Sequence, residues 1–392
     1  MFPSPQTPCC PMHIVIAPDK FRGSLSAIEA AEAMARGVLA ADPTATIDLV
    51  PMADGGEGTV EALVAATQGR FLTADVTGPL GQRVEARYGM LGDNVTAVLE
   101  MSAASGLSLV PEDRRDPSKT STVGTGELLL AAVGQGAERV ILGIGGSATN
   151  DGGAGFATAL GYQLLDTVGE PVEPIGGALS QVARIVPPKD RTALKEMRIS
   201  VACDVENPLC GPRGASIVYG PQKGATPEMI ALLDRNLAHF ARVIGRDLGV
   251  SVAELRGGGA AGGLGAGLVA FAGAKLRRGV ELITQAVSLE ERLQVADLCL
   301  TGEGLIDASS AFGKTAVGVS RVARMRGCPT LAVVGAVGPG ASAVFGEGIE
   351  AYFSLCDRPM TLDDALANAA ALLERASEQA VRAFRAGRES RR

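Results

Sequence analysis

The fold class is decided by residues 13–67, which read HIVIAPDKFRGSLSAIEAAEAMARGVLAADPTATIDLVPMADGGEGTVEALVAAT. Two short apolar runs with β character each lead into a polar turn and then into a stretch with helical character. The predicted strands are His13–Ala17 and Ile47–Pro51, and the predicted helices are Ala27–Ala40 and Thr59–Thr67. This order is typical of α/β proteins. We therefore expect an α/β fold.

The same pattern returns near the end of the chain, after a middle part of different texture. The late elements are predicted as strands Ala296–Thr301 and Thr330–Val334 and helices Thr315–Arg326 and Leu362–Ala386. The middle elements are predicted as antiparallel strands Val84–Gly89 and Thr96–Met101, strands Arg139–Gly143 and Ile199–Asp204, helices Gly124–Gln135 and Pro227–Ile244, and a strand or helix over Gly279–Ala286. We therefore predict two α/β domains. A discontinuous, doubly wound, Rossmann-like domain covers 12–78 plus 287–392, an inserted mixed α/β domain covers 79–286, and 1–11 is a disordered tail.

The composition excludes several classes of protein. The chain has 392 residues, of which 46% are hydrophobic and 20% are charged, and this is too apolar for a disordered chain. Its 51 glycines show no three-residue period, so the chain is not a collagen. A net charge of −7 without a basic stripe argues against nucleic acid as a partner. The terminal arginines, among them Arg382 and Arg385, are expected to cap the C-terminus of a helix.

Neither a membrane span nor a structural zinc site is expected. The long uncharged run Gly257–Ala274 is mostly Gly and Ala, and it predicts a glycine turn followed by a helix packed closely against a neighbour. The seven cysteines are scattered and there are only two histidines, so a close set of zinc ligands is lacking. Scattered thiols, and residues 1–11 that do not resemble a signal peptide, favour a cytoplasmic protein.

Acidic residues follow several predicted strands, within turns that are rich in glycine. They are Asp19, Asp54, Asp151, Asp204 and Glu303. In open α/β sheets, ligands bind outside the carboxyl ends of the strands. A single acidic turn is ordinary loop chemistry, whereas the whole set favours a functional site over solvated turns.

The most specific single segment is Gly143–Gly155, which reads GIGGSATNDGGAG. Its glycines would let backbone N–H groups approach an anion closely, and Ser147, Thr149 and Asn150 add neutral polar groups. A helix that starts near Ala154 would point its N-terminus at the anion. The alternative is a tight structural turn. The segment is not a Rossmann fingerprint, because the acidic residue expected about 20 positions later, after a second strand, is missing.

Basic residues in other turns are candidates for contacts with an anionic ligand. Lys20 and Ser24 lie between the first strand and its helix, and Lys223 lies in a Pro-Gln-Lys-Gly turn. The segment Ala308–Thr315, ASSAFGKT, differs from the P-loop pattern only at its first residue, but it does not follow directly from the preceding strand as a P-loop does. We interpret the match as coincidence and keep Lys314 as a candidate phosphate contact. The alternative for each is a solvated loop charge.

Seven segments together resemble class I glycerate kinases. In the family's order they are IVIAPDKFRGSLSA (Ile14–Ala27), MADGGEGT (Met52–Thr59), GIGGSATNDGGAG (Gly143–Gly155), ACDVENPLCGPRGAS (Ala202–Ser216), GPQKGAT (Gly220–Thr226), GGGAAGGLGAG (Gly257–Gly267) and TGEGLID (Thr301–Asp307). Seven ordered matches are highly specific. The late segment departs from the family's pattern TGEGRID-x-Q-[ST]-x-x-GK-x-P, since Leu305 replaces the Arg, Ser309 the Gln and Ala316 the Pro.

The resemblance implies transfer of the γ-phosphoryl group of ATP to D-glycerate, which gives ADP and 2-phosphoglycerate, or else 3-phosphoglycerate. It implies ATP and Mg²⁺ as cofactors and two α/β domains with the active-site cleft between them. We expect a monomer or homodimer. Two other functions stay open. One is an NAD-dependent oxidoreductase acting on a hydroxy acid, and the other is a non-catalytic protein that binds a sugar acid.

Candidate roles follow from what phosphoryl transfer needs, which is positioning, charge neutralisation and an in-line nucleophile. Asp204 and Asp19 are the candidates for base or metal ligand, with Asp204 assigned to Mg²⁺. Lys20 and Lys314 would neutralise phosphate or the glycerate carboxylate. The residues expected to bind substrate or phosphate are Ser24, Asp54, Gly55, Gly56, Glu57, Gly145, Gly146, Ser147, Thr149, Asn150, Asp151, Gly152, Gly153, Lys223, Glu303 and Asp307.

Overall fold

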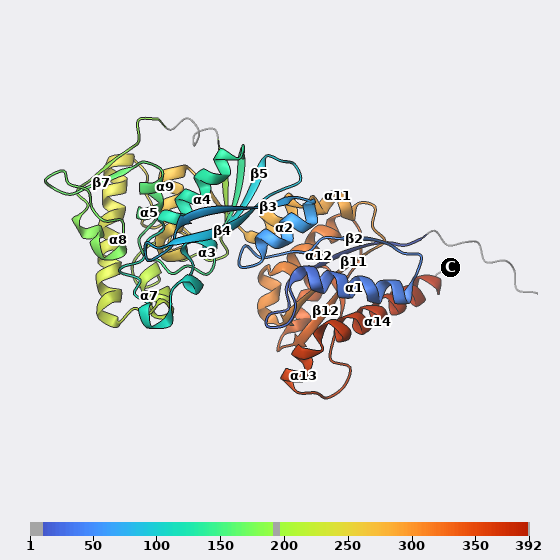
Figure 1. Cartoon of the computed structure of the whole chain (residues 1–392). Helices are drawn as coiled ribbons and strands as arrows, with labels where there is room; N and C mark the ends of the chain where they lie inside the picture. Colours follow the sequence, from blue (N-terminus) through green and yellow to red (C-terminus); the bar gives the residue numbers. More distant parts are fainter. Residues whose placement is uncertain (1–10, 191–196, 391–392) are drawn as a thin grey trace, which may run out of the picture. The chain divides into compact units, whose positions relative to one another are not determined.

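The computed structural model describes residues 11–190 and 197–390 and divides into two compact units. The first unit contains the described residues of Met1–Asp54, Glu61–Ala66 and Ile283–Arg392, and the second contains those of Gly55–Val60 and Thr67–Leu282. Both ends of the chain, blue and red in Figure 1, therefore belong to the first unit. The tail predicted for 1–11 lies outside the described residues, apart from Pro11.

The first unit is built on a five-stranded parallel sheet with the order β13-β12-β11-β1-β2. The strands are β1 (His13–Pro18), β2 (Thr46–Leu49), β11 (Leu298–Ile306), β12 (Thr330–Val337) and β13 (Ile349–Ser354). From β1 the chain moves outward to β2, and it later returns on the other side of β1 as β11. The strand order reverses between β1 and β11, so this is the switch point of a doubly wound sheet.

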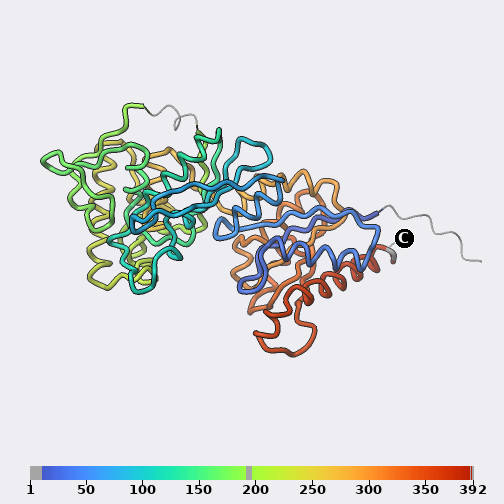
Figure 2. Tube along the Cα trace, in the orientation of Figure 1, coloured from blue at the N-terminus to red at the C-terminus, as the bar shows by residue number. Residues whose placement is uncertain are grey.

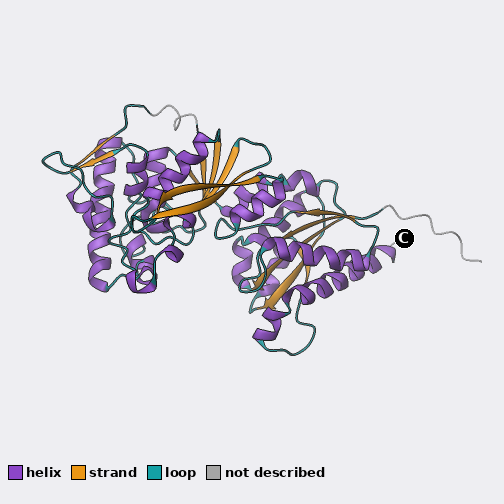
Figure 3. Ribbon diagram, viewed as in Figure 1, coloured by secondary structure: helices purple, strands orange, loops and turns teal. Residues whose placement is uncertain are grey.

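Helices cover both faces of this sheet, as the ribbon in Figure 3 shows. Helices α1 (Ala27–Ala41) and α14 (Ala369–Glu389) pack on the face that carries Val333. Helix α12 (Thr315–Met325) packs on the face that carries Val334, because successive side chains of a strand point to opposite sides. The unit also contains α11 (Leu289–Leu293), α13 (Leu362–Ala367), η6 (Ala308–Phe312) and η7 (Ala341–Glu347), while α2 (Thr59–Thr67) and α10 (Gly279–Ala286) run across the division.

The first and last long helices lie side by side, as the blue and red tubes of Figure 2 show. Helix α1 begins with a capping box, in which the Ser26 hydroxyl accepts from the backbone N–H of Glu29 and the Glu29 carboxylate accepts from that of Ser26. At its other end, Arg382 and Arg385 of α14 donate to its last two carbonyl oxygens. The prediction that the terminal arginines cap a helix is confirmed for Arg382 and Arg385. Arg388 instead pairs with Asp297, and Arg391 and Arg392 lie outside the described residues.

The second unit is built on a six-stranded mixed sheet with the order β10-β9-β6-β5-β4-β3. The strands are β3 (Arg70–Thr77), β4 (Arg83–Met90), β5 (Thr96–Glu100), β6 (Arg139–Gly143), β9 (Arg198–Ala202) and β10 (Lys275–Arg277), and β7 (Gln163–Leu165) pairs separately with β8 (Arg184–Val186). Strands β5, β6, β9 and β10 run parallel, whereas β3 and β4 are antiparallel. The helices are α3 (Ser102–Ser105), α4 (Val123–Gly134), α5 (Ala154–Ala159), α7 (Ala215–Tyr219), α8 (Pro227–Leu248) and α9 (Leu264–Ala272), with the single-turn helices η1 (Leu107–Leu109), η2 (Glu112–Arg114), η3 (Gly176–Gln181), η4 (Pro221–Lys223) and η5 (Ala260–Gly263).

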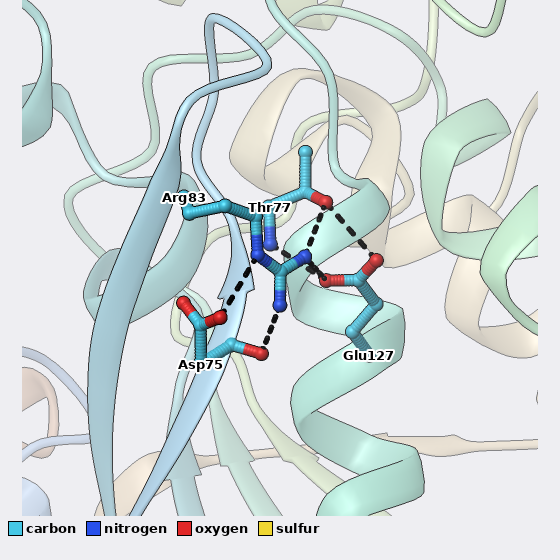
Figure 4. Close-up of polar contacts among 4 residues, drawn as sticks. All are labelled: Asp75, Thr77, Arg83 and Glu127. Carbon is cyan, nitrogen blue, oxygen red and sulfur yellow. Dashed lines mark hydrogen bonds and ion pairs between the residues drawn. The ribbon is translucent and has the colours of Figure 1, made fainter.

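A polar network fastens the β3–β4 hairpin to α4, as Figure 4 shows. The Arg83 guanidinium donates to Oδ2 of Asp75 at 3.2 Å, to Oγ1 of Thr77 at 3.1 Å and to Oε2 of Glu127 at 3.2 Å. Glu127 also accepts from the backbone N–H of Thr77 at 2.6 Å. Because Arg83 is half exposed, its ion pairs contribute little free energy. The bond from Glu127 to the backbone is the stronger attachment.

Two glycine-rich segments of the second unit pack backbone against backbone. A Cβ atom on Gly262 would lie 1.9 Å from the carbonyl oxygen of Thr149, and one on Gly153 would lie 2.9 Å from Cα of Gly267. Only glycine fits at such separations. The prediction of a glycine turn followed by a closely packed helix is confirmed, since α9 (Leu264–Ala272) follows this turn.

Several elements differ from the prediction. Strand β3 was not predicted, and because it pairs with β4 along its length, the division falls at residues 66 and 67 instead of 78 and 79. Strand β13 was also missed. The strand predicted to end at Thr301 continues to Ile306 and pairs with β12 along this stretch, where Gly302 fits a close contact with Val333 instead of forming a turn. The predicted helix Leu362–Ala386 is two helices that meet at Asn368, whose side chain donates to the carbonyl oxygen of Asp364.

The contact of the two glycine segments gives a prediction about stability. Gly262 has a φ of +68° and its Cβ would clash, whereas Gly273 has a φ of +65° with nothing within 4 Å of its Cβ. Gly273→Ala should therefore lower the free energy of unfolding only by the cost of placing an alanine in the left-handed backbone conformation, about 1–2 kcal/mol. Gly262→Ala should lower it by roughly twice that amount or more in urea unfolding followed by circular dichroism. Equal losses would contradict the account of backbone packing.

Candidate active site

The carboxyl edge of the first sheet brings two predicted acidic residues together at the switch point. Asp19 directly follows β1, and Glu303 lies in β11 just after Gly302, which pairs with Pro18. The backbone N–H of Asp19 donates to the carbonyl oxygen of Gly302 at 2.9 Å. Asp19 and Glu303 therefore start from neighbouring backbone positions. Ligands of open α/β sheets bind at such a place.

Two hydrogen bonds hold the Asp19 carboxylate. Oδ2 accepts from the Thr315 hydroxyl at 2.5 Å, and Oδ1 accepts from the backbone N–H of Lys20 at 2.7 Å. Burial raises the pKa of Asp19 above its ordinary value, and the Asp54 carboxylate adds to the rise, while the bond from Thr315 opposes it. Sequence reasoning did not single out Thr315, although it is the last residue of the P-loop-like segment.

Glu303 is buried, with a relative exposure of 9%. Its Oε1 atom has no hydrogen-bond partner among the described residues. Burial raises the pKa of Glu303 to about 7, the Lys314 ammonium opposes this rise, and the carboxylates of Asp19 and Asp307 add to it. An unpartnered buried carboxylate oxygen is costly. This position therefore suits a bound cation or a hydrogen-bond donor.

Lys314 is a basic residue close to two carboxylates of this edge, those of Asp307 and Glu303. Its Nζ atom lies 3.4 Å from Oδ1 of Asp307 and 4.0 Å from Oε2 of Glu303. The Asp307 carboxylate also accepts from the hydroxyl of Ser309 at 2.5 Å, and this bond holds the pKa of Asp307 below its ordinary value. The P-loop-like segment is the short helix η6 (Ala308–Phe312), so it does not form a glycine cradle for phosphate.

The other predicted residues of the first unit lie near the same edge. Asp54 is half-buried, and its charge acts on Asp19. Lys20 is half-buried beside Asp19. The Ser24 hydroxyl donates to the carbonyl oxygen of Phe21 at 3.0 Å, so it closes the turn between β1 and α1.

The carboxyl edge of the second sheet brings together glycines that are far apart in the sequence. A Cβ on Gly55 would lie 2.4 Å from Cβ of Ala202, one on Gly143 would lie 2.5 Å from the carbonyl oxygen of Gly55, and one on Gly145 would lie 3.3 Å from Cα of Gly56. The Gly-Gly turn before α2 therefore lies against the ends of β6 and β9. Bare backbone of this kind can present N–H groups to an anion.

Two of the predicted acidic site residues lie in the second unit and are exposed. Asp204 follows β9, and its Oδ1 accepts from the backbone N–H of Gly279 at 2.9 Å, at the first residue of α10. Asp204 thus stabilises the start of a helix while its carboxylate remains exposed to solvent. Glu57 is exposed in the turn before α2.

Most of the loop Gly143–Gly155 is buried. Gly145 and Gly146 are exposed, whereas residues 147–155 are not. The Asp151 carboxylate accepts from the hydroxyl and the backbone N–H of Thr122 and from the backbone N–H groups of Gly153 and Gly155, and it therefore shapes the loop from inside. Burial raises the pKa of Asp151 against these bonds. The exposed pair Gly145 and Gly146 is the part of the loop that can meet a ligand directly.

Further polar groups are buried beside this loop. The Nζ atom of Lys223 donates to Oγ of Ser147 at 2.7 Å and to the carbonyl oxygen of Thr149 at 2.6 Å, and burial lowers the pKa of Lys223 to about 7. Oδ1 of Asn150 accepts from the Ser216 hydroxyl at 3.2 Å. Within the described residues, Oγ1 of Thr149 and Nδ2 of Asn150 have no hydrogen-bond partner. Gly152 is packed against Leu237 and Phe240 rather than exposed.

A dedicated protein cage for a metal ion is not found. Across residues 11–190 and 197–390, no group of three or more His, Cys, Asp or Glu side chains is arranged to hold a metal ion. Mg²⁺ needs only one or two carboxylates and keeps its waters, so the exposed Asp204 and the unpartnered Oε1 of Glu303 fit it chemically.

In the described part of the chain, every helix is too short or too polar to span a membrane.

The burial of Glu303 gives a prediction about the pH dependence of stability. Its pKa rises from 4.5 to about 7 in the folded chain, so the folded state binds more protons than the unfolded state between these values. The resulting stabilisation is present below pH 4.5 and is lost as the pH rises to about 7. As the pH rises from 5 to 8, the free energy of unfolding of Glu303→Gln should therefore increase by roughly 2–3 kcal/mol relative to that of the wild type.

Urea unfolding at several pH values measures this gain. Glu32→Gln, which removes the same charge from an exposed position of α1, serves as the control and should follow wild type. A Glu303→Gln variant that follows wild type at every pH would contradict the raised pKa.

The chain matches known proteins along nearly its whole length. The model of the glycerate kinase family matches residues 14–385. A glycerate kinase of Halalkalibacterium halodurans is 52% identical over 93% of this chain and 96% of the relative, and the glycerate 2-kinase of Escherichia coli is 49% identical over 91% and 94%. A crystal structure of a protein assigned as glycerate kinase 2 from Salmonella typhimurium LT2 aligns with a TM-score of 0.89 and 48% identity, over 97% of this chain and 100% of that one. The α/β fold at both ends of the chain, the acidic switch point and these matches agree, and the chain belongs to the glycerate kinase family.

Proposed function

We propose that this chain is a class I glycerate kinase, which transfers the γ-phosphoryl group of ATP to the 2-hydroxyl of D-glycerate. The observation that carries the proposal is the identity of 49% to the glycerate 2-kinase of Escherichia coli over most of both chains. The products are then 2-phosphoglycerate and ADP. Neither the oxidoreductase nor the non-catalytic binding protein has comparable support.

The proposed chemistry of the first unit uses the residues at its switch point. Phosphoryl transfer depends mainly on positioning and on neutralising charge. Asp19 is the proposed base, because a carboxylate with a raised pKa takes up the proton of a substrate hydroxyl more readily. Lys314 and Lys20 are the proposed neutralising groups, and Asp307 orients Lys314 through the contact of 3.4 Å.

Mg²⁺ is the proposed metal, and when bound it supplies positive charge to the phosphates of ATP. Asp204 is its proposed ligand in the second unit, as expected from the sequence. In the first unit, Glu303 is the residue proposed to hold Mg²⁺, because its buried Oε1 lacks a partner within the described residues. Both side chains offer the hard oxygen donors that Mg²⁺ prefers.

In the second unit, the proposed contacts to the substrate are backbone N–H groups. Gly145 and Gly146 are exposed, and Gly56 lies against Gly145. These glycines would hold one anionic end of a substrate, while Asp151 shapes the loop behind them.

A cytoplasmic location and a monomeric or homodimeric state remain predictions.

The proposed reaction predicts an activity. Purified protein with Mg²⁺ and ATP should release ADP only when D-glycerate is added. Enolase alone should then convert the product to phosphoenolpyruvate, because enolase acts on 2-phosphoglycerate and not on the 3-isomer. Release of ADP that does not depend on glycerate would sink the proposed function, and a product that requires added phosphoglycerate mutase would overturn the assignment of the 2-hydroxyl.

The proposed roles predict the effects of three substitutions. Asp19→Asn, Lys314→Met and Asp204→Asn should each lower kcat at least about tenfold, a loss typical of removing a group that acts in the transition state. Asp363→Asn, which removes a charge from an exposed position of α13, should leave kcat unchanged. Circular dichroism checks that each variant folds. A folded variant with wild-type turnover removes that residue from the mechanism.

A further inference from the structure

Lys223 is a lysine buried in the second unit, at the end of the single-turn helix η4 (Pro221–Lys223). Its relative exposure is 1%. No ion pair joins its Nζ atom to a described carboxylate, and the charge that acts on it is that of Asp151, farther away. An apolar side chain of similar size would be easier to bury. The hydrogen bonds of its Nζ atom are therefore what offsets the cost of burying Lys223.

Both bonds reach the loop just after its exposed glycines. Nζ of Lys223 donates to the side chain of Ser147 and to the backbone of Thr149, at 2.7 and 2.6 Å. Ser147 follows Gly146 directly. The lysine thus fixes alternate residues of the loop, on the side that faces η4.

The intervening residues of the loop are fixed from a second element. The backbone N–H of Leu107 donates to the carbonyl oxygen of Gly146 at 2.8 Å, and that of Ala148 donates to the carbonyl oxygen of Ser105 at 3.0 Å. These bonds form a short antiparallel bridge that holds the loop against the end of α3 (Ser102–Ser105). Lys223 supplies the matching support from η4, so residues 146–149 are held from two directions.

We propose that Lys223 is a positioning residue that presets the exposed backbone of Gly145 and Gly146 to bind the anionic end of a substrate, without itself touching the substrate. The inference rests on the proposed function and assigns Lys223 a role different from the direct phosphate contact expected from the sequence. A preset loop binds an anion without a loss of backbone freedom at that moment. Loss of the lysine should therefore weaken substrate binding more than it slows chemistry.

The test uses Lys223→Met, which keeps the length of the side chain and removes its donors. Its matched control is Lys275→Met, the same change at an exposed lysine of β10. We expect Lys223→Met to raise KM for D-glycerate or for ATP at least about tenfold, with kcat within about threefold of wild type. The control should match wild type in both constants. A folded Lys223→Met variant with both KM values within about twofold of wild type would overturn the inference.

Hydrogen exchange followed by mass spectrometry provides a readout that does not depend on activity. In Lys223→Met, peptides that cover residues 143–150 should exchange at least about tenfold faster, while peptides of α8 keep their wild-type rate. Unchanged exchange in 143–150 would overturn the positioning role even if KM rose. A wild-type protein without activity would instead refute the proposed function, and the exchange experiment would still decide the role of Lys223.

Should Lys223→Met fail to fold, Ser147→Ala removes one of the two bonds and leaves the lysine in place. We expect a rise in KM of about threefold to tenfold for the same substrate, with faster exchange in 143–150. A wild-type KM and wild-type exchange in Ser147→Ala would count against the inference. Where Lys223→Met does fold, Ser147→Ala should add little to it, because both changes break the same bond.

Discussion

The parallel pairing of β1 with β11 is the interaction on which the first unit depends. It joins the start of the chain to a strand near its end, and it continues past Pro18 in the bond from the Asp19 backbone to Gly302. This pairing creates the point where the strand order reverses, and it places Asp19 beside Glu303. The acidic residues are then desolvated together, which raises the pKa of both. Such a site is poised for cationic or proton-donating ligands, at a cost in stability that the surrounding sheet must offset.

In the second unit, glycines allow the loop after β6 to pack closely against its surroundings. This loop is held by an internal carboxylate, Asp151, by the buried Lys223 and by direct contact with the backbone around Gly262. Only Gly145 and Gly146 emerge from this packing. Glycine thus has two physical roles in one segment. Most of its glycines allow close packing, and two are exposed to solvent.

Much of the fold followed from local patterns, because amphipathic periodicity, turn residues and caps are encoded within a few residues of each other. The pattern predicted α2 and β6 at their observed bounds. Strand β3 was missed, since its pairing with β4 is a tertiary property. The site was predictable as a set of acidic and glycine-rich turns. The burial of residues 147–155 was not, because it depends on contacts with a segment about a hundred positions away.

The switch point of the first unit holds a buried carboxylate, that of Glu303, and its Oε1 has no hydrogen-bond partner among the described residues. Difference infrared spectroscopy of wild type against Glu303→Gln measures this most directly, since it follows the protonation of one carboxyl group. We expect a carboxyl band that titrates with a midpoint near pH 7 in the free protein. The midpoint should fall once Mg²⁺ and ATP are added, because bound positive charge favours the ionised form. The claim would be contradicted by the absence of any such band above pH 5, or by a midpoint that the ligands leave unchanged.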